Sequence, residues 1–147
     1  MIIREARSGE EQRILPAYEW LFEPPGRRPR SWDPTREAAA LAEAISASSS
    51  RVLVAESYGE IVGLCTAYLE LNSVRFGRRC WVEDLAVHPS RRSEGIGGGL
   101  LDAAETWARR AGATHLELDT GVARTDSQRF YQRRNPATVG FSYSWEL

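Results

Sequence analysis

Apolar positions recur along the chain with two different periods, and the change from one to the other predicts where helices give way to strands. The opening run at 2–6, IIREA, has the apolar character of a short strand. Over 8–22 the apolar residues stand three and four apart, as on the buried face of a helix. Ser8 and Glu11 have the spacing of a capping box at the start of this helix, and Pro16 predicts either a kink inside it or a later helix start.

The middle of the chain passes from a second helix to a group of strands. Asp33 is a suitable N-cap for a helix with Pro34 in its first position, and apolar residues follow on one face as far as Ile45. The period then shortens to that of a strand. Three apolar, partly β-branched runs predict strands at 51–56, 61–71 and 80–87.

The last third alternates helices with strands. A helix is predicted over 97–111, with Gly112 as its C-terminal glycine. A strand at 114–119, a helix at 126–134 and a closing strand at 138–147 follow. This order predicts an α+β fold with a mixed sheet and helices on its faces.

Length and composition fit one globular domain spanning residues 1–147. The chain is 42% hydrophobic and 27% charged, which is typical of a folded protein and not of a disordered one. Its net charge of −1 gives no basic field for nucleic acid. We expect no membrane span, because no apolar run approaches the roughly 20 residues required. The first residues lack the apolar stretch of a secretory signal, and Cys65 and Cys80 are expected to be buried free thiols. A cytoplasmic protein is therefore expected.

Residues 88–101, HPSRRSEGIGGGLL, place four glycines at the start of the predicted helix at 97–111. Glycine disfavours a helix, but a glycine-rich turn at a helix N-terminus lets backbone N–H groups converge on an anion. The phosphate loop of nucleoside triphosphatases requires a lysine after its glycines, and none follows here. The dinucleotide fingerprint requires a glycine at residue 100, which is leucine.

The segment Arg92-Ser93-Glu94-Gly95-Ile96-Gly97 instead resembles the Arg/Gln-x-x-Gly-x-Gly/Ala loop of the GCN5-related N-acetyltransferase (GNAT) family. As in that family, it lies between an apolar strand, WVEDLAVHP, and an amphipathic helix, and RFYQRR follows downstream. The resemblance implies an acyl-CoA N-acyltransferase-like fold, with a mostly antiparallel sheet in three layers. It also implies acetyl-CoA as the acyl donor, with no metal. The donor's pantetheine arm would lie along Leu85, Ala86 and Val87, and its pyrophosphate would be held by Arg92, Ser93, Glu94, Gly95, Ile96, Gly97 and Gly98.

Acetyl transfer to an amine requires a base and benefits from an acid. An amine with a pKa of about 10 must lose a proton before it attacks, and a leaving thiol with a pKa of about 8.5 gains from a proton donor. Glu83 and Asp84 are the candidate bases, and adjacent carboxylates in a regular strand point to opposite faces unless a bulge intervenes. Tyr131, within RFYQRR, resembles the family tyrosine whose hydroxyl can protonate the departing thiolate.

The chain departs from the family pattern around this tyrosine. Asn135-Pro136-Ala137 stands where the usual Gly-Phe pair is expected soon after Tyr131. Arg124 stands seven residues before Tyr131, where many members have an asparagine that contacts the cofactor. A guanidinium suits a phosphate, so Arg124 is a candidate contact for a CoA phosphate.

The acceptor is expected to be an amine, most simply that of a cationic small molecule. Glu83, Asp84 and Asp119 can form an acidic cleft for such a group. The resemblance places the acceptor beside the segment between the first two helices, where Trp20, Glu23 and Trp32 are candidate contacts.

Two other functions stay open: acetylation of a peptide or protein N-terminus, and a non-catalytic acyl-CoA-binding regulatory module. The aromatic stretch FSYSWEL is a candidate surface for a homodimer.

Overall fold

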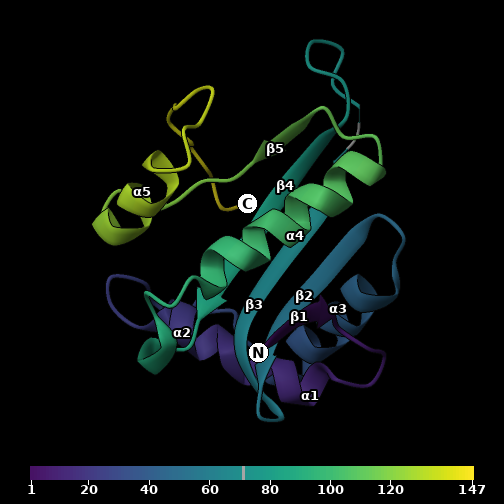
Figure 1. Cartoon of the computed structure of the whole chain (residues 1–147), viewed down its shortest axis with the longest axis vertical. Helices are drawn as coiled ribbons and strands as arrows, with labels where there is room; N and C mark the ends of the chain where they lie inside the picture. The colour runs from purple at the N-terminus through teal and green to yellow at the C-terminus, as the bar shows by residue number, and fades with distance from the viewer. Residues whose placement is uncertain (71) are drawn as a thin grey trace.

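A five-stranded sheet forms the centre of the computed structural model, which describes residues 1–70 and 72–147. Its strands lie in the order β1-β2-β3-β4-β5, as Figure 1 shows. They span Ile2–Glu5, Ser50–Ser57, Glu60–Leu69, Arg79–Val87 and His115–Glu117. The first four strands pair antiparallel, and β5 joins β4 in parallel. The prediction of a mixed, mostly antiparallel sheet is confirmed; Leu71, at the end of the predicted strand 61–71, lies outside the described residues.

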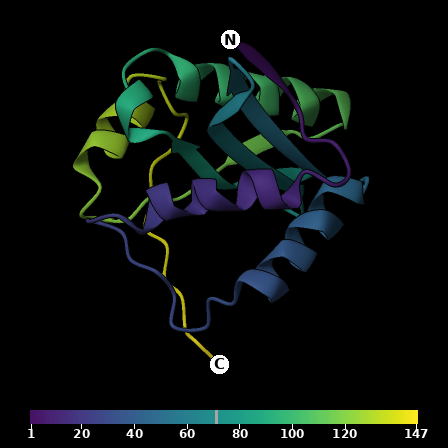
Figure 2. The same cartoon turned by 90° about the horizontal axis from the view of Figure 1, so that it is seen from below.

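Helices cover both faces of the sheet and make three layers (Figures 1 and 2). One face is covered by α1 (Glu11–Ile14), the 3₁₀ turn η1 (Leu15–Tyr18), α2 (Glu19–Phe22) and α3 (Pro34–Ser46). The other face is covered by α4 (Ile96–Arg110) and α5 (Thr125–Gln132). A second 3₁₀ turn, η2 (Pro89–Arg91), links β4 to α4.

The sheet separates two apolar layers, because β3 is buried on both sides. Leu64 packs with the layer under α1 and α3, whereas its neighbour Cys65 packs with the layer under α4. A side chain at Gly63 would place its Cβ 2.8 Å from Ile96 and 2.9 Å from Leu100. Glycine at this position therefore lets the start of α4 lie directly against the sheet.

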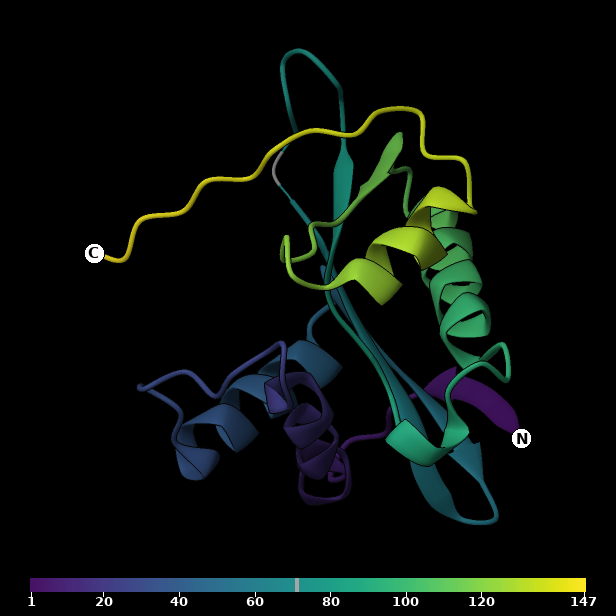
Figure 3. The same cartoon turned by 90° about the vertical axis from the view of Figure 1, so that its left-hand side faces the viewer.

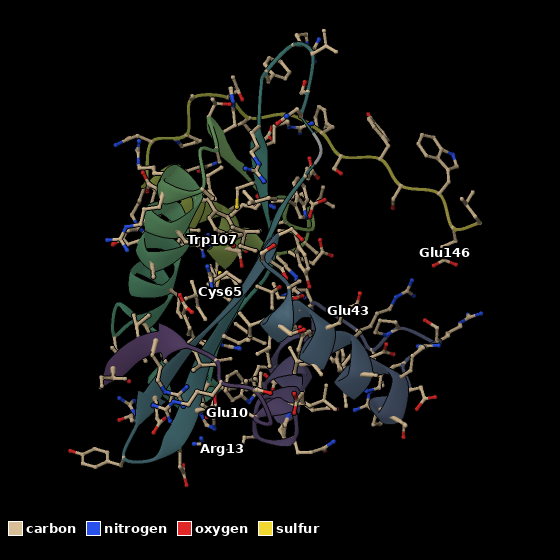
Figure 4. The ribbon with its side chains drawn as sticks, turned by 90° about the vertical axis from the view of Figure 1, so that its right-hand side faces the viewer. Glu10, Arg13, Glu43, Cys65, Trp107 and Glu146 are labelled. Atoms are coloured by element: carbon tan, nitrogen blue, oxygen red, sulfur yellow. The ribbon has the colours of Figure 1, made fainter. Side chains whose placement is uncertain are left out.

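The N-terminal helical segment is divided at Pro16, as the sequence predicts. The predicted capping box is wrong, because the N-cap of α1 is Glu10 and no side chain caps it. Glu10 instead accepts hydrogen bonds from the Arg7 N–H (2.7 Å) and from the guanidinium of Arg4 on β1 (2.8 Å). Arg13 completes the cluster at 2.8 Å from the same carboxylate, and Figure 4 shows Glu10 and Arg13 side by side. These ion pairs fix the start of the helix in place of Ser8.

The predicted closing strand at 138–147 is also wrong for the single chain. Residues 133–147 are exposed and form no strand, and Figure 3 shows them running away from the body of the molecule. A strand needs a neighbour that completes its backbone hydrogen bonds. Within the described residues, no strand pairs with this segment.

Candidate active site

Strands β4 and β5 separate part of the way along the sheet. Their pairing runs from Arg79 opposite His115 to Trp81 opposite Glu117. Beyond Trp81, β4 continues to Val87 with β3 alone as its partner among the described strands. The backbone groups on the other edge of β4 are consequently open to a ligand, at the position of Leu85, Ala86 and Val87.

A bulge in β4 sends the two candidate bases to different surroundings. Thr66 pairs with Asp84 and the next residue of β3, Ala67, pairs with Val82, so Glu83 is the extra residue. Glu83 is exposed and accepts a hydrogen bond from the Trp81 indole N–H at 2.6 Å.

Asp84 forms hydrogen bonds that connect the sheet to the N-terminal helical segment. Its Oδ2 accepts hydrogen bonds from the Tyr18 hydroxyl (2.9 Å) and the Thr66 hydroxyl (2.6 Å). Burial raises the pKa of Asp84, and the hydrogen bonds from Thr66 and Tyr18 oppose that rise. Burial, with the Asp84 charge beside it, also raises the pKa of Tyr18. These bonds tie η1 to the sheet, and they occupy Asp84 on the face away from α4.

Glu83 lies in a cavity of about 260 Å³. The cavity is formed by α2, the loop that follows it, β4, the segment after β5 and α5. Of the residues singled out from the sequence, the cavity brings together Glu83, Leu85, Asp119, Arg124 and Tyr131.

Other lining residues were not singled out from the sequence. They include Arg27, Pro29, Thr120, Gly121 and Ser127. Thr120 and Gly121 come directly after the predicted strand at 114–119, and the splayed end of that strand is the signal that points to them.

Tyr131 contributes a hydroxyl group that is held protonated. Burial raises its pKa to about 12, the charge of Asp119 acts in the same direction, and the charge of Arg124 opposes it. The ring packs against Phe130 at 5.2 Å between centroids. In the part of the chain that the structure describes, the hydroxyl makes no hydrogen bond to protein, so it is available to a ligand.

Arg124 connects the start of α5 to the loop after α2. Its Nη2 donates to the Leu21 carbonyl at 2.9 Å and lies under Gly26. A Cβ at Gly26 would be 2.0 Å from that carbonyl and 2.4 Å from the guanidinium, so only glycine fits there. Arg124 thus holds the wall of the cavity together as well as lining it.

The glycine-rich turn leaves backbone N–H groups free at the start of α4. Gly95, the N-cap, has φ +83°, a conformation that favours glycine, and no side chain caps the helix. The first helical bond from this turn is donated by the Gly99 N–H to the Gly95 carbonyl. The N–H groups of Ile96, Gly97 and Gly98 therefore lack helical acceptors, which suits an anion such as a pyrophosphate.

The side chains of the glycine-rich turn before α4 differ in burial and in the groups that they contact. Ile96 is buried in the core, so its backbone alone is available. Glu94 pairs with Arg91 at 2.9 Å, and Ser93 has φ +64°. Arg92 lies 3.9 Å from Glu23, and its Nε is 3.4 Å from the Val87 carbonyl.

The turn, the open edge of β4 and α5 are neighbours. A Cβ at Gly97 would lie 3.7 Å from Val87 and 3.8 Å from Phe130, and one at Gly98 would lie 3.6 Å from Arg134. A phosphate at the start of α4 would thus be next to the strand edge that leads to Glu83 and Tyr131.

Three residues predicted for the acceptor do not line the cavity that holds Glu83. Trp20 packs edge-on against His88 at 5.2 Å and lines a second cavity, of about 280 Å³. Trp32 packs against Phe22 at 4.8 Å, and Glu23 faces Arg92. Both cysteines are buried free thiols, as predicted.

The described residues contain neither a candidate metal cluster nor a membrane-spanning helix. Within 1–70 and 72–147, no cluster of three or more His, Cys, Asp or Glu residues is placed to hold a metal ion. No helix in those ranges is long and apolar enough to cross a bilayer.

A three-layer mixed fold, whose sheet splits beside a glycine-rich helix start, defines an acyl-CoA N-acyltransferase-like protein. The sequence model of the acetyltransferase (GNAT) family matches residues 14–135. The chain belongs to this family, which confirms the resemblance of its glycine-rich loop.

The similar proteins are named for different acceptors or for none. The chain is 39% identical over 79 residues to an uncharacterized N-acetyltransferase, YhdJ, of Bacillus subtilis, covering 54% of this chain and 55% of that protein. It is 37% identical over 89 residues to the aminoalkylphosphonate N-acetyltransferase of Salmonella typhimurium, covering 60% and 58%. The chain thus spans a little over half the length of these relatives. The crystal structure of an aminoglycoside acetyltransferase from an uncultured soil metagenomic sample has the same fold, with a TM-score of 0.76, 21% identity and coverage of 99% and 96%.

Proposed function

We propose that the protein is an N-acetyltransferase that moves the acetyl group of acetyl-CoA directly to an amine of a small, cationic molecule. The observation that carries this proposal is the position of Glu83 and Tyr131 in one cavity, beside the open edge of β4. Membership of the acetyltransferase family supports the reaction type.

The donor would lie along the split in the sheet. Its pyrophosphate would accept hydrogen bonds from the free N–H groups at Ile96, Gly97 and Gly98, with the guanidinium of Arg92 nearby. Its pantetheine amides would pair with the backbone of Leu85 to Val87, which has no strand partner on that edge among the described residues.

The chemistry then assigns a role to each group in the cavity. Glu83, directly or through a water molecule, removes a proton from the acceptor ammonium, and the free amine attacks the thioester carbonyl. The C–N bond forms and the C–S bond breaks. Tyr131 donates a hydrogen bond, and then its proton, to the sulfur that leaves, and the second proton lost by the new amide nitrogen restores the Tyr131 hydroxyl. The Tyr131 pKa of about 12 keeps the hydroxyl protonated at neutral pH before the reaction.

The acceptor class follows from the charges in the cavity. Glu83 and Asp119 both line it, and neither forms an ion pair within the described part of the chain. Arg27 and Arg124 line the same cavity, and Arg124 donates to the Leu21 carbonyl. The two carboxylates are therefore the groups of the cavity that would attract an ammonium group. The relatives named for aminoalkylphosphonate and aminoglycoside substrates also acetylate amines of small molecules, which supports this class.

Release of free CoA thiol tests the proposal. The protein is incubated with acetyl-CoA and a panel of small amines, aminoglycosides, aminoalkylphosphonates and peptides with free N-termini. Turnover on a small amine, lowered about 100-fold in Glu83→Gln but kept in Glu43→Gln on the exposed face of α3, supports it. Turnover on peptides alone indicates a peptide or protein N-acetyltransferase. Tight CoA binding without turnover on any acceptor indicates a binding module, and absence of CoA binding overturns the donor site as well.

A further inference from the structure

The cavity that holds Glu83 has walls of both charges. Glu83 and Asp119 are acidic, and Arg27 and Arg124 are basic. Arg124 donates to the Leu21 carbonyl and so forms part of the cavity wall. The Arg27 side chain is exposed and, in the part of the chain that the structure describes, forms no hydrogen bond and no ion pair. Arg27 therefore brings to this cavity a guanidinium that is left for a ligand.

The loop after α2 holds the backbone on either side of Arg27. Gly26 packs under the Arg124 guanidinium, where no side chain would fit. Arg28 forms an ion pair with Glu19 on α2. Since both of its neighbours are held, Arg27 stays at the wall of the cavity while its guanidinium has no partner among the described residues.

Arg27 and Glu83 belong to the same face of the sheet. The loop after α2 lies in the layer of α1, α2 and α3, as Figure 2 shows. Burial, and then the charges of Asp84 and Glu83, raise the pKa of Tyr68 on β3. Tyr68 shares a strand face with Leu64, which packs in the layer under α1 and α3. The Glu83 charge is therefore also directed toward that layer.

The groups that we assign to the donor lie on the opposite face. Tyr131 is on α5, which covers that face together with α4 and its glycine-rich start. Burial raises the pKa of Tyr131 and the charge of Asp119 adds to this rise, so Asp119 lies near the donor as well. The cavity volume of about 260 Å³ is a little below the roughly 300–1,000 Å³ of small-molecule sites. In so small a site, an acceptor whose ammonium meets Glu83 has Arg27 within reach on the same face.

We propose that the acceptor carries an anionic group at the end opposite its amine, and that Arg27 binds this group while Glu83 receives the ammonium. The inference rests on the proposed function and narrows its acceptor to amines with a negatively charged end. The planar guanidinium offers paired N–H donors that match the oxygens of a carboxylate, sulfonate or phosphonate. Asp119 repels such a group from the donor side, which gives the acceptor one orientation.

Acetylation of matched amines is the first test. n-Propylamine, β-alanine, taurine and 2-aminoethylphosphonate share a primary amine on a short chain and differ in the end group. Release of CoA thiol gives kcat/KM for each of them. In wild type, at least one of the three anionic amines should exceed n-propylamine by about 10-fold, the effect of one hydrogen bond to a charged group. If n-propylamine is acetylated as well as or better than all three, the inference is overturned and the proposed function stands.

Variants of Arg27 test the group that binds the anion. The kcat/KM of each amine is divided by that of n-propylamine for the same variant, so that overall rate and amine basicity cancel. Arg27→Gln should remove most of the preference for the anionic amine, and Arg27→Lys should keep part of it. Arg27→Glu should instead favour 1,3-diaminopropane, a gain that a misfolded protein could not show. Arg30→Gln, in the same loop but not lining the cavity, is the matched control and should keep the wild-type preference. A preference that survives Arg27→Gln overturns the inference.

Equilibrium binding separates this inference from the proposed reaction. If no amine is acetylated, the proposed function fails, and calorimetric titration of the protein–CoA complex with the same amines decides the inference. An anionic amine that binds wild type about 10-fold more tightly than it binds Arg27→Gln supports the role of Arg27 without any turnover. If none of the three binds, or if the variant binds as tightly as wild type, the inference is overturned as well.

Discussion

The substitution Tyr131→Phe removes only the hydroxyl oxygen of the proposed acid. It therefore tests the proton donor while the packing of the ring and the other groups of the site stay the same. The hydroxyl makes no hydrogen bond to protein within the described residues, so its loss leaves no buried partner unsatisfied. The phenyl ring keeps its packing against Phe130. We therefore expect the free energy of unfolding to change by less than about 0.5 kcal/mol.

The expected kinetic effect follows from the raised pKa. A hydroxyl with a pKa of about 12 is a weaker acid than a thiol of about 8.5. It thus stabilises the charge that develops on sulfur mainly by a hydrogen bond, and full proton transfer comes late. This places the loss near the lower end of the range for general acids, about 100-fold in kcat, or about 2.7 kcal/mol. The KM for acetyl-CoA should stay within about twofold, since the hydroxyl acts on the leaving group.

The pH dependence has a definite sign. Because burial raises the pKa of Tyr131 to about 12, the hydroxyl stays protonated through the neutral and mildly alkaline range. Activity should rise with pH as the acceptor amine loses its proton, without a descending limb from Tyr131 below about pH 12. The Tyr131→Phe variant should show the same dependence of activity on pH, with a lower rate at every pH.

Release of CoA thiol, followed between pH 6 and about 10, measures both effects. Tyr58→Phe, at a fully exposed turn, is the matched control and should leave the rate unchanged. The reasoning fails if Tyr131→Phe keeps more than a third of wild-type kcat. It also fails if wild type has a descending limb near pH 10 that the variant lacks, because the hydroxyl would then have an ordinary pKa.

Three further predictions concern the bases, the glycine-rich turn and the acid range. Glu83→Gln should lower kcat about 100-fold and leave the free energy of unfolding unchanged. Asp84→Asn should lower the free energy of unfolding in urea by about 1–3 kcal/mol and keep kcat within a few-fold. The reverse outcome would exchange the roles of the two carboxylates. Gly95→Ala, at φ +83°, should cost about 1–2 kcal/mol and raise the KM for acetyl-CoA, and an unchanged KM would argue against the pyrophosphate site. The hydrogen bond from Arg4 lowers the pKa of Glu10 from 4.5 to about 2, so its stabilisation is complete above pH 4.5 and lost as the pH falls toward 2. Wild type should lose up to about 3 kcal/mol more than Glu10→Gln over that interval in denaturant titrations, and equal losses would contradict the ion-pair cluster.

Most elements could be predicted because their signals are local. The predicted strand at 80–87 is observed at Arg79–Val87, and the predicted helix at 97–111 is observed at Ile96–Arg110. In both, hydrophobic periodicity over one segment coincides with burial in the fold. Asp33 accepts a hydrogen bond from the Thr35 N–H at 3.1 Å, so the predicted cap of α3 is confirmed as well. A cap of this kind involves neighbours in sequence alone, and no distant residue competes for it.

The sequence-based predictions of local structure are wrong where residues distant in the sequence determine that structure. Ser8 and Glu11 have the right spacing, but Arg4 on β1 and Arg13 hold Glu10 and set the start of the helix differently. The bulge at Glu83 depends on the register of β3 against β4, which no local pattern specifies. The alternation over 138–147 is typical of a strand, but no described strand pairs with this segment, and alternation alone does not form a strand.

The same distinction explains why the sequence indicates the donor more clearly than the acceptor. In the proposed donor site a pyrophosphate would be held by backbone N–H groups, and these require glycine at few, closely spaced positions, such as Gly95 and Gly97. The proposed acceptor would meet side chains from segments that the fold brings together from far apart, including Arg27 after α2 and Asp119 after β5, which line the same cavity. Aromatic residues near the first helices, such as Trp32, pack against one another instead of lining the cavity. Acceptor specificity in this protein is therefore a property of tertiary structure, and substitutions at Arg27 or Asp119 should change which amine is acetylated before they change use of acetyl-CoA.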